Sequence, residues 1–248
     1  MNAPAIFGRD VEIDELRKLV SRRHSFLLHG SAGVAKTLLL GRLMNEIPEL
    51  LYCGDSSRSQ LVFRALAAAL LAIKNCHVLR ACKPNAIHEK SAVSIRGIVI
   101  EALREGRYWI VLDHLQSSSQ SFAAAIKDVC SRAETPLIAV ARSAHIDAGF
   151  LLPMFSDRSS RYRLRNLETE AAKKFALRAA EEMQLEAVNR DEAIEKIVRY
   201  SKGSPGAIMA MLQMAVNPNP HSSPTATNSS LTLPKSTSSS RPCISISG

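Results

Sequence analysis

Short apolar runs alternate with stretches of helical periodicity over most of the chain. Runs of strand length predict β-strands at 24–29, 50–53, 108–113, 136–142 and 161–167. Apolar positions at helical spacing predict helices over 9–22, from the residues after 37 to Pro48, and over 58–74, 88–105 and 122–130. Strands that alternate with helices form parallel sheets buried on both faces. The pattern therefore predicts an α/β fold with a doubly wound parallel sheet flanked by helices.

The pattern changes at Glu168, after which only helices are predicted, over 168–183, 190–201 and 205–215. We interpret these as a small all-helical lid. From residue 217 onward Ser, Thr, Pro and Asn dominate, and such a segment has too little to bury to offset the entropy of ordering. The expected domains are an α/β domain at 1–167, the helical lid at 168–216 and a disordered tail at 217–248.

A glycine-rich loop lies between the first predicted strand and the helix that follows it. This loop, GSAGVAKT at 30–37, matches G-x-x-x-x-G-K-[ST] except at Ala35. Backbone N–H groups in such a loop cradle phosphates, the lysine reaches the β- and γ-phosphates and the threonine hydroxyl ligates Mg²⁺. The residues predicted to contact nucleotide here are Gly30, Ser31, Ala32, Gly33, Val34, Ala35, Lys36, Thr37 and Leu38.

Ala35 stands where the motif usually has glycine. Glycine there permits an unusual φ or a close backbone approach, and a Cβ can crowd the phosphate. Because alanine is the smallest alternative, we expect weakened nucleotide binding and not its loss.

A second motif ends the strand predicted at 108–113. Four apolar residues precede Asp113, the pattern in which a carboxylate at the carboxyl end of a strand helps to hold Mg²⁺. Thr37 and Asp113 are therefore the predicted metal-site residues. The next residue is His114. Nucleotide-hydrolysing proteins with this motif carry an acid there that activates water, so slow turnover is expected.

Taken in order, these motifs resemble the AAA+/STAND class of P-loop ATPases, including NB-ARC-like ATPases and the ATPase subunits of transposition systems. Residues 6–12, IFGRDVE, are similar to the opening h-x-G-R-[ED]-x-E of the class. Residues 203–207, GSPGA, are similar to the G-x-P-G-A of its lid. The resemblance spans roughly residues 5–215 and implies a P-loop NTPase fold with ATP or ADP and Mg²⁺ as ligands.

The resemblance also implies roles for single residues. Phe7, Gly8 and Arg9 belong to the adenine pocket, Pro205 packs near adenine, and Arg142 senses the γ-phosphate. Arg142 is equally well explained as a surface arginine at the end of a strand. A further arginine cluster either supplies an arginine finger to a neighbouring molecule or forms a solvated face: Arg158, Arg161, Arg163 and Arg165.

The formal net charge of +9 suits a polyanionic partner, although the basic residues are spread along the chain. Nucleic acid is therefore an alternative partner beside a protein partner or self-association. The five cysteines show no CxxC pair and indicate reduced thiols. No apolar run is long enough to span a membrane and the N-terminus lacks signal-peptide features, so a cytoplasmic protein without membrane contact is expected.

Three functions fit these observations. The first is a slowly hydrolysing, nucleotide-dependent switch that acts through a partner, with Lys36, Asp113, His114 and Arg142 as the catalytic set. The second is a DNA-associated AAA+ accessory ATPase similar to transposition helpers. The third is a nucleotide-binding module without hydrolysis. His114 and Ala35 favour the first and third, and the basic balance favours the second.

Overall fold

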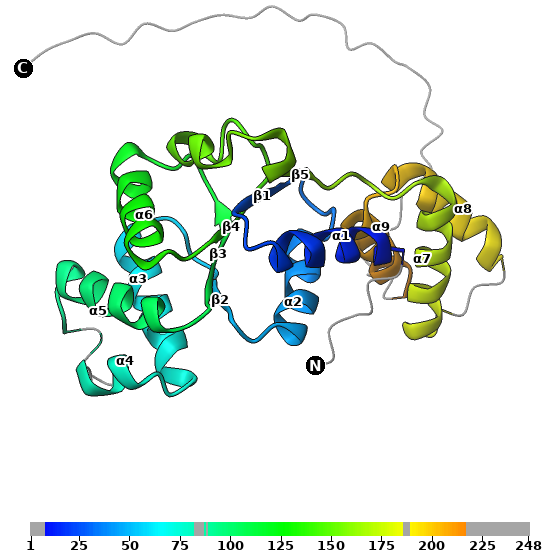
Figure 1. The fold of residues 1–248 in the computed structure, drawn as a ribbon. Coiled ribbons are helices and arrows are strands. Elements are labelled where there is room, and N and C mark those ends of the chain that lie inside the picture. The colour runs from blue at the N-terminus through cyan, green and yellow to red at the C-terminus, as the bar shows by residue number, and fades with distance from the viewer. Residues whose placement is uncertain (1–7, 82–86, 88, 186–188, 217–248) are drawn as a thin grey trace, which may run out of the picture.

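The computed structural model describes residues 8–81, 87, 89–185 and 189–216. Phe7 and the tail predicted at 217–248 lie outside these residues. Five strands form one sheet: β1 (Phe26–His29), β2 (Leu50–Cys53), β3 (Trp109–Leu115), β4 (Leu137–Ala141) and β5 (Arg161–Arg163). Their order is β2-β3-β4-β1-β5 and every pairing is parallel, which confirms the predicted doubly wound sheet (Figure 1).

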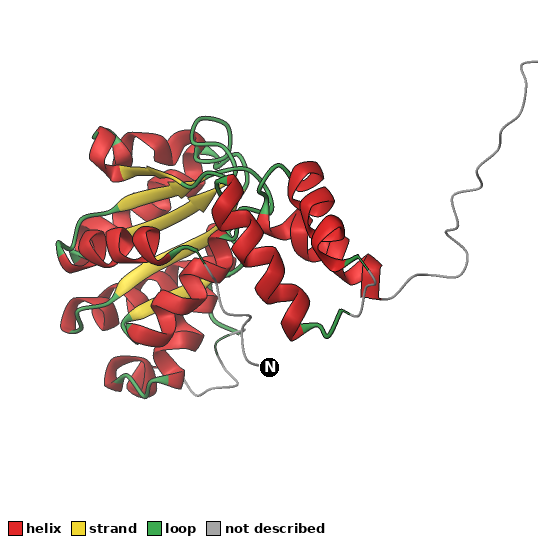
Figure 2. Cartoon of the chain, turned by 90° about the vertical axis from the view of Figure 1, so that its right-hand side faces the viewer, coloured by secondary structure: helices red, strands yellow, loops and turns green. Residues whose placement is uncertain are grey.

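Helices cover both faces of the sheet (Figure 2). One face packs against α1 (Asp10–Ser21) and α2 (Lys36–Glu46). The other packs against α3 (Ser59–Ala72), α4 (Cys76–Ala81), α5 (Ala92–Glu105) and α6 (Gln120–Ala133). Alternation along β1 explains both contacts, because Phe26 and Leu28 enter the first core and Leu27 the second. Two short 3₁₀ helices, η2 (Gly149–Phe155) and η3 (Arg158–Ser160), lead into β5.

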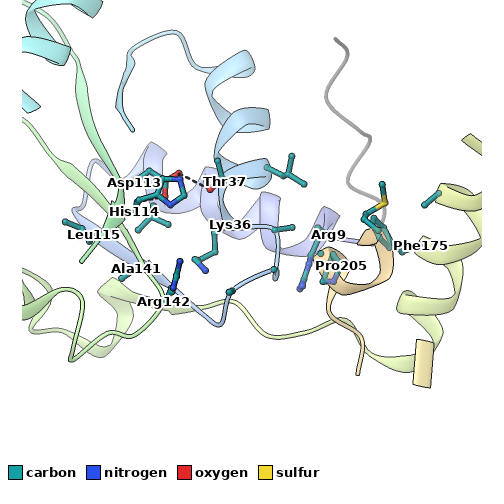
Figure 3. A pocket seen from close by; sticks show the side chains of 18 of the residues that line it. Arg9, Lys36, Thr37, Asp113, His114, Leu115, Ala141, Arg142, Phe175 and Pro205 are labelled. Atoms are coloured by element: carbon teal, nitrogen blue, oxygen red, sulfur yellow. Dashed lines mark hydrogen bonds and ion pairs between the residues drawn. The ribbon is translucent and has the colours of Figure 1, made fainter. Parts of the chain in front are cut away.

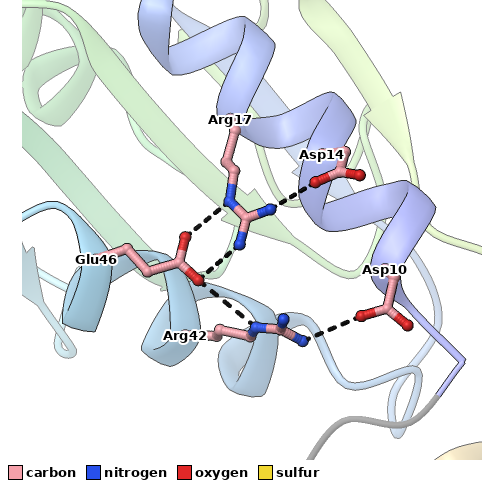
Figure 4. Close-up of polar contacts among 5 residues, drawn as sticks. All are labelled: Asp10, Asp14, Arg17, Arg42 and Glu46. Carbon is pink, nitrogen blue, oxygen red and sulfur yellow. Dashed lines mark hydrogen bonds and ion pairs between the residues drawn. The ribbon is translucent and has the colours of Figure 1, made fainter.

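An ionic network joins α1 to α2 (Figure 4). The Arg17 guanidinium donates to Glu46 Oε1 at 2.7 Å and to Asp14 Oδ1 at 2.5 Å. Arg42 lies 3.6 Å from the same Glu46 carboxylate and 3.4 Å from Asp10. Exposed ion pairs contribute little stability, so the buried apolar side of α1 contributes most to holding the helix in place.

The C-terminal helices form a small bundle with a core of its own. They are α7 (Thr169–Glu182), α8 (Arg190–Ser201) and α9 (Pro205–Val216). Their apolar sides meet in a separate hydrophobic cluster beside the carboxyl edge of the sheet (Figures 1 and 2). Among the described helices, none is both long and apolar enough to cross a bilayer.

Several element boundaries differ from those predicted, and the short helix α4 was not predicted. The helix expected from 88 begins at Ala92, because the Ser91 hydroxyl accepts the Ser94 N–H at 3.2 Å and caps it. The strand expected to end at Asp113 continues to Leu115. The last strand is shorter than 161–167 and ends at Arg163, where the chain leaves the sheet for the helical bundle.

Candidate functional site

The glycine-rich loop, residues 30–37, connects the carboxyl end of β1 to the N-terminus of α2. Only glycine fits at its start, because a Cβ on Gly30 would lie 2.3 Å from the Leu164 carbonyl oxygen. The backbone of the loop therefore begins in close contact with the segment at Leu164, which follows β5. The positive end of the α2 dipole faces the loop, which is a favourable place for phosphate groups.

Two residues of the loop have left-handed backbone conformations. Gly33 has a φ of 79° and Ala35 a φ of 75° with ψ 29°. Glycine adopts this region freely, whereas an L-residue with a Cβ is strained there. Ala35 thus carries the strain that the usual glycine avoids, and the cost lies in its own backbone.

The Lys36 ammonium folds back onto the loop that carries it. It donates to the carbonyl oxygens of Gly30 at 2.7 Å and Ser31 at 2.9 Å. Burial lowers the pKa of Lys36, which the Asp113 carboxylate partly offsets, and the nearby Arg142 lowers it further. A half-buried cation held only by carbonyl groups is placed to gain from an incoming anion.

Asp113 is the polar centre of the site and is 1% exposed. Its Oδ2 atom accepts hydrogen bonds from the Thr37 hydroxyl at 2.9 Å and the Tyr52 hydroxyl at 3.0 Å. Burial and the Asp113 charge raise the pKa of Tyr52 to about 12, so its hydroxyl remains a donor at neutral pH. The Ser56 hydroxyl donates to the Asp113 carbonyl at 2.8 Å. Elements α2, β2 and β3 thus converge on one carboxylate.

A β-bulge follows Asp113. Leu112 pairs with Ala139 and Leu115 with Ala141, so Asp113 and His114 together oppose the single residue between them. His114 has a φ of 55°, and its side chain is 60% exposed, with Nε2 3.6 Å from Asp113 Oδ2. The bulge therefore turns an imidazole, and no second carboxylate, toward the cleft beside Asp113.

Arg142 begins the loop after β4. The Asp147 carboxylate accepts the backbone N–H groups of Arg142 at 2.9 Å and Ser143 at 2.8 Å, which fixes this turn. The Arg142 side chain is exposed and lies near Lys36 at the rim of the cleft (Figure 3).

The helical bundle touches the phosphate loop through backbone atoms. The Gly206 N–H, at the start of α9, donates to the Gly33 carbonyl at 2.8 Å. A Cβ on Gly206 would lie 2.9 Å from Gly33 Cα, so the two backbones meet where no side chain fits. Pro205 precedes this contact and lines the cleft on the bundle side.

Arg9 is buried beneath the loop, with 2% exposure. Its guanidinium donates to the Arg165 carbonyl at 2.6 Å and pairs with Glu12. It also donates to the Val34 carbonyl at 3.4 Å. Among the described residues its Nε atom has no hydrogen-bond partner. Arg9 therefore ties the start of α1 to the loop and to the strand-to-bundle connection.

The sheet edge and the bundle enclose a cleft of about 330 Å³ (Figure 3). The predicted site residues that line it are Arg9, Ala32, Gly33, Ala35, Lys36, Thr37, Leu38, Asp113, His114, Arg142 and Pro205. Val34 is buried below the loop. Gly30 and Ser31 line a second cavity behind it, and exposed Gly8 packs beside Ala171 of α7. Phe7 is outside the described residues.

The donor set fits a magnesium nucleotide. The oxygens of Thr37 and Asp113 are 2.9 Å apart at the carboxyl edge of the sheet, and Mg²⁺ prefers such hard oxygen ligands. The half-buried Lys36 ammonium and the α2 N-terminus supply positive charge beside them. Thr37 and Asp113 would hold the metal, and Lys36 would hold the phosphates.

Several residues of the site were not among those predicted from the sequence. Tyr52, which bonds Asp113, carries no motif, and its link to Asp113 depends on β2 lying next to β3, which the sequence does not specify. Lining residues on or beside β3 and β4 were also missed: Leu115, Gln116, Val140 and Ala141. Others come from the bundle: Phe175, Ala179, Glu182 and Met209. Positions 175, 179 and 182 share one face of α7, so helical spacing groups them, but that spacing is equally typical of a core face.

The fold and the site together define a P-loop ATPase domain. A family model for the AAA ATPase domain matches residues 5–141, which is more than half of the chain. The chain therefore belongs to the AAA ATPase domain family, and the predicted resemblance to AAA+ ATPases is confirmed at that level. A search of curated proteins finds none that matches.

Three solved structures from archaea are similar to this fold. The Walker-type ATPase paby2304 of Pyrococcus abyssi has 17% identity and a TM-score of 0.60, covering 86% of this chain and 69% of that one. Orc1 of Aeropyrum pernix, solved in complex with DNA, has 15% identity and a TM-score of 0.62, covering 86% and 60%. Cdc6p of Pyrobaculum aerophilum has 13% identity and a TM-score of 0.55, and the match covers 86% of this chain and 61% of that one. The chain thus spans about three fifths of these last two proteins, and the likeness is one of fold.

The strain at Ala35 generates the first prediction. Ala35→Gly removes a Cβ from a left-handed residue and should raise the free energy of unfolding by about 1 kcal/mol. It should also tighten ATP binding, measured by calorimetry. Ala32→Gly is the control, because Ala32 lies in the same loop without a positive φ and should lose stability through backbone entropy. Equal stability of Ala35→Gly and wild type would show that the loop is unstrained.

The second prediction concerns the contact between the loop and the bundle. Gly206→Ala places a Cβ against Gly33 Cα, so α9 must shift, and ATP affinity should fall about tenfold, or about 1.4 kcal/mol. Gly41→Ala on α2 is the matched control, because its Cβ would meet no atom within 4 Å. If both variants bind ATP as wild type does, the contact does not shape the cleft.

Proposed function

We propose that this domain is a slowly hydrolysing nucleotide switch, which binds ATP or ADP with Mg²⁺ and acts through a protein partner or a second copy. The observation that carries the proposal is the polar centre of the cleft. Asp113 is held by Thr37 and Tyr52, yet the next residue is an exposed histidine and not an acid. Such a site supports binding of a magnesium nucleotide more than rapid turnover.

Each residue of the catalytic set has a distinct task in this proposal. Lys36 leaves the carbonyls of Gly30 and Ser31 and pairs with the phosphates, so it exchanges two neutral contacts for ionic ones. Asp113 and Thr37 hold Mg²⁺, which supplies charge neutralisation at the phosphates when bound. Arg142 at the rim reaches the terminal phosphate.

Adenine would lie toward the bundle. Arg9 and Pro205 border that end of the cleft, together with Phe175 and Met209. The aromatic and aliphatic side chains offer the apolar walls that a purine prefers. We propose that α7–α9, within the lid predicted at 168–216, close over the base. The hydrogen bond from the Gly206 N–H to the Gly33 carbonyl would then couple the position of these helices to the phosphate loop.

The absence of a second acid in the lining near Asp113 supports slow hydrolysis. Among the described lining residues the carboxylates are Asp113 and Glu182, and Glu182 lies on α7 in the bundle. A positioned base contributes about 10²–10⁴ in rate. An imidazole that is 60% exposed, and whose one polar partner among the described residues is Asp113, is a poor substitute.

Single-turnover hydrolysis of ATP with excess Mg²⁺ tests this function. Wild type should turn over well below the ordinary range of about 1–10 s⁻¹. His114→Glu should gain at least about tenfold by supplying a general base. His114→Asn is the matched control, because asparagine tolerates the left-handed backbone but offers no base, and should match wild type. Lys36→Ala should lose most ATP binding.

Two results would contradict the switch. Rapid wild-type hydrolysis that His114→Asn abolishes would make the imidazole a working base. Unchanged ATP affinity in Lys36→Ala would show that the phosphate loop does not bind the phosphates of ATP.

A further inference from the structure

A second cavity lies beside the phosphate loop, at Gly30 and Ser31. Its volume is about 580 Å³ and its lining is strongly basic. The charged and titratable residues that line it are His29, Arg142, His145, Arg158, Arg161 and Arg163. No carboxylate belongs to this lining. We call it the arginine cavity.

The topology of the sheet gathers these residues. His29 ends β1 and pairs in register with Arg163 of β5, and Arg142 follows β4 on the other side of β1. Arg158 comes from η3, just before β5. Three arginines that are close in sequence therefore meet a fourth from a distant loop, while Arg165 takes no part in the lining.

The positive groups are close enough to oppose one another. Burial lowers the pKa of His29, and the charges of Arg163, Arg161 and His145 lower it further. Arg161 is fixed through Nε, which donates to the Phe155 carbonyl at 2.6 Å. Arg158 and Arg163 are exposed, and within the described residues neither side chain has a hydrogen-bond or carboxylate partner. An anion would relieve this repulsion.

Guanidinium groups bind phosphate through paired N–H donors, and several around one concave surface match a run of phosphates. The lining contains no Phe, Tyr or Trp on which a base could stack. We propose that the arginine cavity binds the phosphodiester backbone of nucleic acid, without reading base sequence. The net charge of +9 favours the approach of such a polyanion.

The arginine cavity adjoins the nucleotide cleft and shares Arg142 with it. Gly30 and Ser31, whose carbonyls hold Lys36, also line it. A backbone phosphate and a nucleotide phosphate can therefore compete for Arg142. Binding itself needs neither ATP nor hydrolysis, so the inference stands apart from the proposed switch.

Fluorescence anisotropy with labelled oligonucleotides tests the proposal. Wild type, without nucleotide, should bind single-stranded and duplex DNA of unrelated sequences with similar affinity, and the affinity should fall as salt rises from about 50 to about 200 mM. In Arg158→Ala/Arg163→Ala the affinity should fall at least about tenfold, and the slope of log affinity against log salt should shrink by about 2. Both residues are exposed, and thermal unfolding checks that the double variant folds.

A charge-matched double variant is the control. Arg80→Ala/Arg107→Ala removes the same charge from α4 and from the chain just before the amino end of β3. This variant should bind within about twofold of wild type, because neither residue lines the arginine cavity at the carboxyl ends of the strands. Equal losses in the two double variants, or no wild-type binding at about 50 mM salt, would overturn the proposal. Poly-glutamate that displaces DNA at equal charge would indicate an acidic protein instead. If Arg158→Ala/Arg163→Ala lost ATP-driven self-association but still bound DNA as wild type does, the arginines would instead contact a second copy of the chain.

Discussion

The contact between Gly33 and Gly206 determines how the two halves of the nucleotide cleft meet. One half is the carboxyl edge of the sheet, and the other is the helical bundle. They touch where the Gly206 N–H donates to the Gly33 carbonyl at 2.8 Å, and a Cβ on Gly206 would lie 2.9 Å from Gly33 Cα. Gly33 also needs its positive φ of 79° to turn the phosphate loop. Gly33 thus both turns the phosphate loop and contacts the helical bundle.

A second feature of the cleft is backbone strain beside its reactive groups. Ala35 and His114 both adopt left-handed conformations, one next to Lys36 and the other next to Asp113. Non-glycine residues in this region cost about 1–3 kcal/mol each, and such strain gathers at functional sites. At Ala35 the strain follows from the replacement of the usual glycine, and at His114 it accompanies the β-bulge. In the proposed function, both residues affect nucleotide binding and hydrolysis.

Much of the fold followed from the sequence because apolar runs and helical spacing report local burial. The phosphate loop and Asp113 were found because their chemistry needs fixed residues at fixed positions. Tyr52 was missed since it reaches Asp113 only across neighbouring strands, whose order the sequence does not specify. The bulge at His114 left no signal either, because its register depends on β4. The arginines at 158–163 stood out as a cluster, but their meeting with Arg142 and His29 required the fold.

Amide hydrogen exchange in the three nucleotide states tests most directly whether nucleotide acts on the bundle through Gly206. ATP with Mg²⁺ should slow exchange both in the phosphate loop, residues 30–37, and at the start of α9, residues 203–208. ADP should protect the loop with a smaller effect on α9, because ADP lacks the terminal phosphate that we propose Arg142 contacts. Protection by ATP that is confined to the phosphate loop, with α9 unchanged from the nucleotide-free protein, would contradict the account.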